Sequence, residues 1–110
     1  MSAIVTSDLG EDWYTNSHTW QTILERAFDG LDPVRADRYT AYANTIGADF
    51  ELMPIEVRPE IARWLLVTIE DLLGPAGTDY GWDKPRDQQH LGELAAMLRR
   101  MAEGATKTAD

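Results

Sequence analysis

The sequence predicts an all-α protein, a small bundle of about four helices that follows a partly ordered acidic N-terminal segment. Three observations favour this fold class. Apolar residues recur at helical spacing over residues 18–30 and 85–103, and residues 59–73 are apolar around most of a helical circumference. Alternation of apolar and polar residues is confined to short stretches, which we do not interpret as strands. A chain of 110 residues with 44% hydrophobic residues is sufficient for one folded core.

The first two predicted helices are recognised by their ends as well as by their spacing. Apolar residues fall at intervals of three and four over residues 18–30, and Gly30 can end that helix because glycine tolerates a left-handed backbone. Asp32 followed by Pro33 is typical of a helix N-cap and the first helical position. A second helix is therefore predicted over residues 33–46.

The second half of the chain carries the most apolar helix. Residues 47–57 have no sustained period, so we expect a loop there that can contain one short helical turn. Residues 59–73 have few polar positions, which is typical of a central helix, and Gly74 with Pro75 ends it. After a connector, residues 85–103 repeat apolar side chains at helical spacing, which predicts the last helix.

These elements predict a single folded domain. We expect an acidic lead-in segment over residues 1–16, a single helical domain over residues 17–104 and a frayed tail over residues 105–110. The N-terminus lacks the basic and apolar regions of a signal peptide, and the longest apolar run, residues 64–69, is far shorter than the roughly 20 residues that span a bilayer. We therefore expect a cytoplasmic protein.

The charge of the chain is strongly negative and unevenly distributed. The formal net charge is −9, and the first 32 residues hold six acidic residues against one basic residue, Arg26. Such a surface repels phosphate backbones and anionic membranes and attracts basic protein surfaces. We therefore expect a basic protein partner, no direct contact with nucleic acid and no membrane binding, while a homo-oligomer remains open.

Few residue patterns are suited to catalysis or metal binding. The sequence has no cysteine, its two histidines, His18 and His90, lie in polar surroundings, and no loop has the ligand spacing of an EF-hand. Phosphate-binding glycine motifs are absent from the sequence, and a helix-turn-helix over residues 39–57 is disfavoured because Pro54 would interrupt its recognition helix. We therefore predict no catalytic residue, no metal and no cofactor.

Four of the Trp and Tyr residues lie outside the predicted helices, two in the lead-in segment and two in the connector TDYGWDKP. In one interpretation both segments fold back and cap the bundle, which buries the rings. In the other the rings anchor a partner, because Trp and Tyr are enriched at binding hot spots and carboxylates steer basic partners. The candidate partner-binding residues are then Glu11, Asp12, Trp13, Tyr14, Asp79, Tyr80, Trp82 and Asp83.

The combined pattern favours a binding protein over an enzyme. We expect a non-enzymatic acidic domain that masks a basic surface on a partner protein, as an inhibitor or immunity-type protein of a bacterium or phage does. An alternative is a structural or accessory subunit that forms a helical homo-oligomer or docks on a larger enzyme, using the apolar segment 59–73. A carboxylate-based enzyme is a third hypothesis, and it requires a cleft beside Glu60, Glu70 and Asp71.

Overall fold

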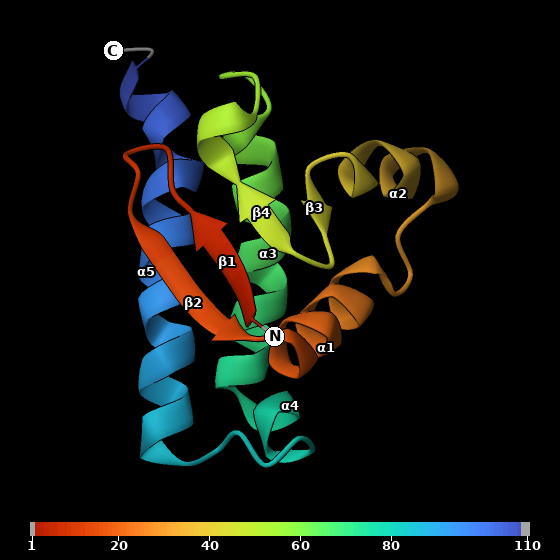
Figure 1. The fold of residues 1–110 in the computed structure, drawn as a ribbon, viewed down its shortest axis with the longest axis vertical. Coiled ribbons are helices and arrows are strands. Elements are labelled where there is room, and N and C mark those ends of the chain that lie inside the picture. The colour runs from red at the N-terminus through yellow and green to blue at the C-terminus, as the bar shows by residue number, and fades with distance from the viewer. Residues whose placement is uncertain (1, 109–110) are drawn as a thin grey trace.

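The computed structural model describes the backbone of residues 2–108 and the side chains of residues 2–103. Within this part of the chain, four short strands form one mixed sheet that lies against a pair of long helices (Figure 1). The prediction of an all-α bundle is therefore wrong. The fold is mixed, with the strand order β2-β1-β4-β3 and a helical layer behind the sheet.

The segment predicted as an acidic lead-in is a β-hairpin. Strand β1 (Ser2–Thr6) pairs antiparallel with strand β2 (Asp12–Asn16). In the turn, the hydroxyl of Ser7 accepts hydrogen bonds from the backbone N–H groups of Leu9 and Glu11, both at 3.1 Å. Gly10 adopts a φ of 82°, which a glycine tolerates without strain. Local turn chemistry therefore closes the hairpin.

The alternation that marks a strand is hidden in this hairpin by the side chains on its outer face. Ala3 and Val5 of β1 point inward and are fully buried, but Ile4 between them points outward and is also apolar. In β2, Trp13 points inward and its neighbour Tyr14 points outward. Because apolar or aromatic side chains occupy both faces, the period of two does not show in the sequence.

The second predicted helix is shorter than expected. Helix α2 (Pro33–Thr40) ends before two short strands, β3 (Ala43–Asn44) and β4 (Gly47–Asp49), which pair antiparallel with each other. Strand β4 also pairs in parallel with β1, so the prediction of a helix over residues 33–46 is wrong in its last part. The spacing of residues within this segment could not reveal β4, because its parallel partner β1 lies far away in the sequence.

The other predicted helices are present close to their expected positions. They are α1 (Ser17–Phe28), α3 (Arg58–Leu73) and α5 (Pro85–Thr108). A four-residue helix, α4 (Pro75–Thr78), follows α3, and a 3₁₀ turn, η1 (Phe50–Leu52), follows β4. Helix α5 continues into the predicted tail, of which residues 109–110 lie outside the described part of the chain.

The core lies between the inner face of the sheet and the helices. Helices α3 and α5 pack along their lengths behind β1 and β2, and α1 lies beside α3 (Figure 1). The largest fully buried side chains come from all these layers and include Val5, Trp20, Ile23, Phe50, Ile61, Leu65, Ile69, Leu72, Leu91, Leu94 and Leu98. Among the described residues, no helix has the length and apolar character needed to cross a membrane.

Candidate protein-binding face

Two rows of side chains run across the outer face of the sheet, from β2 through β1 to β4. The pairing register places in the first row Tyr14, Ile4 and Gly47. It places in the second row Asp12, Thr6 and Asp49. Paired positions in a sheet lie about 5 Å apart, and residues two apart on a strand share a face, so the rows adjoin. We call this surface, an apolar row beside an acidic row, the outer sheet face.

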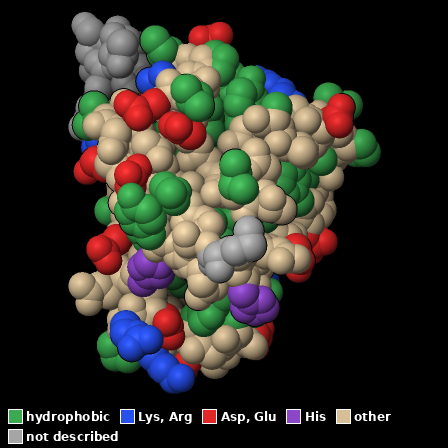
Figure 2. Space-filling model, viewed as in Figure 1, with side chains coloured by type: hydrophobic (Ala, Val, Ile, Leu, Met, Phe, Trp, Pro, Cys, Tyr) green, Lys and Arg blue, Asp and Glu red, His purple; other side chains and the backbone are tan. Residues whose placement is uncertain are grey.

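The apolar part of the outer sheet face is open to solvent. Tyr14 is 57% exposed and Ile46, beside β4, is 73% exposed. A depression of about 440 Å³ lies next to Ile4 and Gly47, with Leu52 on its border. Figure 2 looks onto this side of the molecule and shows hydrophobic side chains over the strands with a group of acidic side chains beside them.

The acidic row contains a carboxylate held by hydroxyl groups. Asp12 accepts hydrogen bonds from the hydroxyl groups of Thr6, at 2.8 Å, and Tyr14, at 3.1 Å. The hydrogen bond to Asp12 and its negative charge raise the pKa of Tyr14 above its ordinary value, which favours the protonated phenol. Among the described side chains Asp12 forms no ion pair, so its charge remains available to a cationic partner.

The acidic residues of the hairpin turn, by contrast, are paired with a cation. Arg100 of α5 lies 2.7 Å from a carboxylate oxygen of Glu11 and 3.5 Å from one of Asp8. These ion pairs attach the turn to the last helix. Glu11, a predicted partner-binding residue, is thus compensated within the chain, whereas Asp12 beside it is not.

The predicted partner-binding residue Trp13 lies on the inner side of the hairpin. Its side chain is only 6% exposed, and its ring stacks on the imidazole of His90 with a centroid separation of 4.4 Å. The indole Nε1–H donates a hydrogen bond to the backbone carbonyl of His90 at 2.9 Å. Trp13 therefore joins the sheet to α5, as the capping interpretation predicts, and only its neighbour Tyr14 reaches the outer sheet face.

The connector residues form a second cluster, apart from the outer sheet face. The rings of Tyr80 and Trp82 lie 5.2 Å apart, Trp82 is half-buried against the core, and Tyr80 is 42% exposed. Tyr80 borders a depression against α1, while Trp82 borders another beside the start of α5. Their acidic neighbours Asp79 and Asp83 are exposed. The structure therefore does not unite the two predicted segments in one surface.

Several residues of the outer sheet face and of its border were missed by sequence reasoning. These are Ile4, Thr6, Ile46, Asp49 and Leu52. One signal was available for the first two: the β-branched run IVT is followed by SDLG, a sequence typical of a turn. For the others no local signal was available, since they join the face only through the pairing of β4 with β1.

Neither a metal-binding group among the described residues nor a relative guides the assignment of a function. In the part of the chain with described side chains, no three His, Asp or Glu residues are grouped so that they could hold a metal ion. Comparison of the chain with models of known protein families, with curated proteins and with solved structures found no significant match. The candidate site therefore rests on its own geometry.

Proposed function

We propose that this protein binds a basic partner protein through the outer sheet face and thereby masks the partner's cationic surface, as an inhibitor or immunity-type protein does. The observation that carries the proposal is the adjacency of the two rows across β2, β1 and β4, one apolar and one acidic. In the folded protein both rows lie on the solvent side of the sheet and not on the side that faces the core. Exposed apolar side chains beside charged ones are typical of a binding surface.

The apolar row supplies contact area. Tyr14 is an amphipathic aromatic residue of the type enriched at binding hot spots, and its hydroxyl group is oriented by Asp12. The depression beside Ile4 can receive a protruding side chain of the partner, and Ile46 extends the apolar surface next to it. Burial of these exposed side chains would provide the hydrophobic part of the binding free energy.

The acidic row supplies selectivity for a cationic partner. Asp12 and Asp49 lie on either side of Thr6 on neighbouring strands, and the chain as a whole carries a net charge of −9. Lysine or arginine side chains of a partner would meet two carboxylates next to an apolar contact, an arrangement that speeds encounter and disfavours acidic proteins.

The alternative of a helical homo-oligomer loses part of its rationale in this fold. Most of the apolar surface of α3 is covered by neighbouring helices, since Ile61, Leu65 and Ile69 are buried and Val67 is the exposed apolar residue on that helix. Self-association through the outer sheet face does not depend on α3. It is one of the outcomes that the binding experiment distinguishes.

Capture from a lysate of the native host with the tagged full chain tests the proposal. We expect the wild-type protein to retain a stoichiometric basic protein. Tyr14→Ala combined with Ile46→Ser should weaken the affinity for that protein about thirtyfold or more, because two exposed apolar contacts are removed from the interface. Both residues are exposed, so circular dichroism and thermal unfolding should show the fold unchanged.

Val34→Ser is the matched control. Val34 is an aliphatic residue on α2 with 78% exposure, and it is not part of the outer sheet face. This variant should bind like the wild type. Retention of the partner by the double variant with unchanged affinity would refute the assignment of the face, and recovery of the chain with only a second copy of itself would favour the oligomer.

A further inference from the structure

The sheet has one edge at which a further strand can join it. In the described part of the chain, β2 is the terminal strand of the order β2-β1-β4-β3 and pairs on one side only, with β1. At the opposite edge, β3 has only two residues, and the carbonyl of Asn44 accepts a hydrogen bond from the Nε1–H of Trp20 at 2.7 Å. The longer strand β2 is therefore the edge that is suited to strand addition.

The hydrogen bonds around β1 show which backbone groups of β2 point outward. The N–H of Ile4 donates to the carbonyl of Ile46 at 3.1 Å, so the backbone groups of Ile4 point toward β4 and not toward β2. The N–H of Ser7, by contrast, donates to the carbonyl of Glu11 on the other side, at 2.8 Å. The even-numbered residues of β1 therefore bond to β4, and the odd-numbered ones bond across the hairpin.

The same alternation applies to β2. Trp13 and Thr15 lie opposite odd-numbered residues of β1, so their backbone groups bond to β1. Asp12 and Tyr14 lie opposite even-numbered residues, so their N–H and carbonyl groups point away from β1, toward the edge. Both residues are exposed, and no hydrogen bond with another described backbone group is recorded for them at this edge. The edge therefore presents backbone donors and acceptors that an added strand can satisfy.

The charges beside this edge favour a basic strand. Asp12 lies on the edge itself and forms no ion pair with a described side chain. Beyond the other end of β2, a depression of about 440 Å³ lies between Asn16 and the first turns of α5. Its lining holds two carboxylates, from Asp87 and Glu93, against one cation, Arg86. A segment along β2 would thus meet carboxylates at both ends of the strand.

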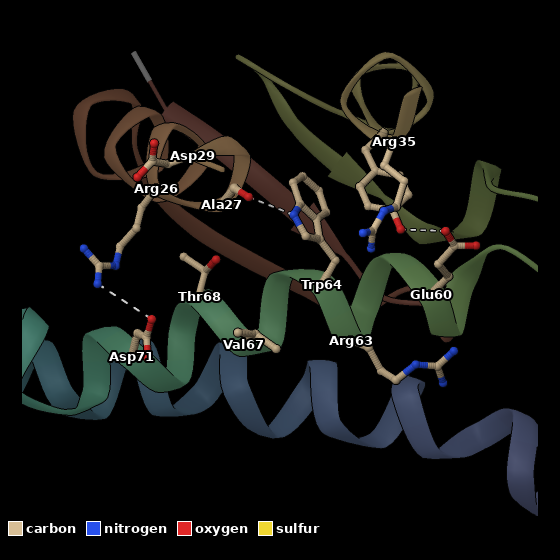
Figure 3. Close-up of a pocket in the computed structure, with 11 residues that line it drawn as sticks. Arg26, Ala27, Asp29, Arg35, Glu60, Arg63, Trp64, Val67, Thr68 and Asp71 are labelled. Atoms are coloured by element: carbon tan, nitrogen blue, oxygen red, sulfur yellow. Dashed lines mark hydrogen bonds and ion pairs between the residues drawn. The ribbon is translucent and has the colours of Figure 1, made fainter. Parts of the chain in front are cut away.

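The carboxylates of the larger cleft between α1, α2 and α3, of about 580 Å³, are better compensated within the chain (Figure 3). Asp71 lies 3.7 Å from Arg26. Glu60 accepts a hydrogen bond from the hydroxyl of Tyr39 at 2.6 Å and lies 3.0 Å from Arg38. The β2 edge therefore offers a basic segment both backbone partners and unpaired carboxylates, which this cleft does not.

We propose that the basic partner of the outer sheet face donates an extended segment, which pairs with β2 and continues the sheet. The inference rests on the proposed function, because the partner is the same basic protein. In strand addition, main-chain hydrogen bonds supply affinity and alternate side chains supply selectivity. Alternate side chains of the added strand lie beside Asp12 and Tyr14 and so extend the outer sheet face. A second copy is a poorer occupant, because each copy carries a net charge of −9.

Amide exchange with solvent, followed by NMR on the ¹⁵N-labelled full chain, tests this proposal. The probe is a short acetylated and amidated peptide of alternating lysine and valine. In excess peptide, exchange at the amides of Asp12 and Tyr14 should slow about fivefold or more, because they gain hydrogen-bond partners. The amides of Trp13 and Thr15 are internal controls that should change little, since they already bond to β1. A peptide of alternating glutamate and valine should have no such effect.

Two substitutions of Tyr14 separate its backbone from its ring. Tyr14→Ala and Tyr14→Pro both remove the ring, but only the second removes the N–H. Proline is tolerated at an edge position whose N–H faces solvent, and thermal unfolding of both variants checks the fold. We expect the proline variant to bind the lysine peptide about fivefold more weakly than the alanine variant, because one hydrogen bond at the edge is lost.

The charge of Asp12 is tested in the same titration. Asp12→Asn should weaken binding of the lysine peptide about threefold, because it removes an exposed carboxylate at the edge. Asp29→Asn is the matched control. Asp29 is an exposed carboxylate of the cleft in Figure 3, at the far end of α1 from β2, so this variant should bind like the wild type.

Unchanged exchange at Asp12 and Tyr14 in excess lysine peptide, equal slowing by the glutamate peptide, or equal affinity of the two Tyr14 variants would overturn strand addition. Slow exchange at these amides that depends on protein concentration without peptide would assign the edge to a second copy instead. Capture of a basic partner through the outer sheet face, combined with unchanged exchange at the edge, would refute this inference and leave the proposed function intact.

Discussion

Trp13 and Tyr14 are adjacent in sequence and lie on opposite faces of β2, so their substitutions should have different effects. Trp13→Phe removes the hydrogen bond to the His90 carbonyl and part of a buried ring, and should reduce the free energy of unfolding by about 2 kcal/mol. Tyr14→Phe should change it little, because that ring is exposed. Urea denaturation of both variants measures the difference, and equal losses would contradict the inward orientation of Trp13.

The phenol of Tyr39 makes stability depend on pH in the alkaline range. Burial, and then the hydrogen bond to and charge of Glu60, raise its pKa above the ordinary value of 10.0. The folded state therefore favours the protonated phenol. Its contribution is fully present below the pKa of the unfolded chain and is lost as the pH rises through the higher pKa of the folded state.

We therefore expect the free energy of unfolding to fall as the pH rises above about 10, and to fall less steeply in Tyr39→Phe, which has no group to ionise there. Urea denaturation at several pH values between about 8 and 11 measures both slopes. The loss of a buried hydrogen bond lowers the stability of the variant at every pH, so the slopes rather than the absolute values are compared. Identical slopes would contradict the assignment to Tyr39.

At the scale of elements, the parallel pairing of β4 with β1 depends on Gly47. Its φ is 136°, and a Cβ there would lie 1.8 Å from the carbonyl oxygen of Ile4. Gly47→Ala must therefore separate the two strands, and we expect it to cost about 3 kcal/mol or more in the free energy of unfolding. The outer sheet face would be lost with the pairing, because Ile4 and Asp49 would no longer lie on adjoining rows.

Gly92→Ala is the matched control for this glycine. Gly92 lies within α5, and a Cβ there meets no heavy atom within 4 Å. Since alanine favours a helix more than glycine does, this variant should gain up to about 1 kcal/mol. The same substitution is thus expected to change the free energy of unfolding in opposite directions at the two positions, as measured by urea denaturation. Similar effects at both positions would contradict the described strand pairing.

At the scale of the whole molecule, negative charge is unevenly neutralised. Arg100 compensates Asp8 and Glu11, whereas Asp12 on the outer sheet face has no such partner among the described side chains.

The net charge of −9 also predicts how salt should affect partner binding. Raising the salt from about 50 to 500 mM shortens the Debye length from roughly 14 to 4 Å. We expect the association rate with the captured basic partner to fall over this range and the dissociation rate to change less. Stopped-flow or surface-binding kinetics measure both rates, and an association rate independent of salt would contradict electrostatic steering by the acidic row.

The sequence by itself determined the chain's main helices. The apolar spacing in α1, α3 and α5 is a property of contiguous segments, and so is the N-terminal signal Asp32-Pro33 of α2. Both can therefore be recognised without any knowledge of the fold. The aromatic residues were also recognised as a group that needs an explanation. What each ring does could not be inferred in the same way, because that depends on which side of its segment the core covers.

Only the tertiary structure decided the sheet and the candidate face. Strands β3 and β4 are too short to carry a period, and β4 becomes a strand because β1, far away in the sequence, lies beside it. The same pairing brings Asp49 next to Thr6 and places Ile46 near Ile4. Burial of Trp13 and exposure of Tyr14 follow from the helices packed behind the sheet. Non-local contacts of this kind have no counterpart in local spacing, which is why they become visible only in the folded chain.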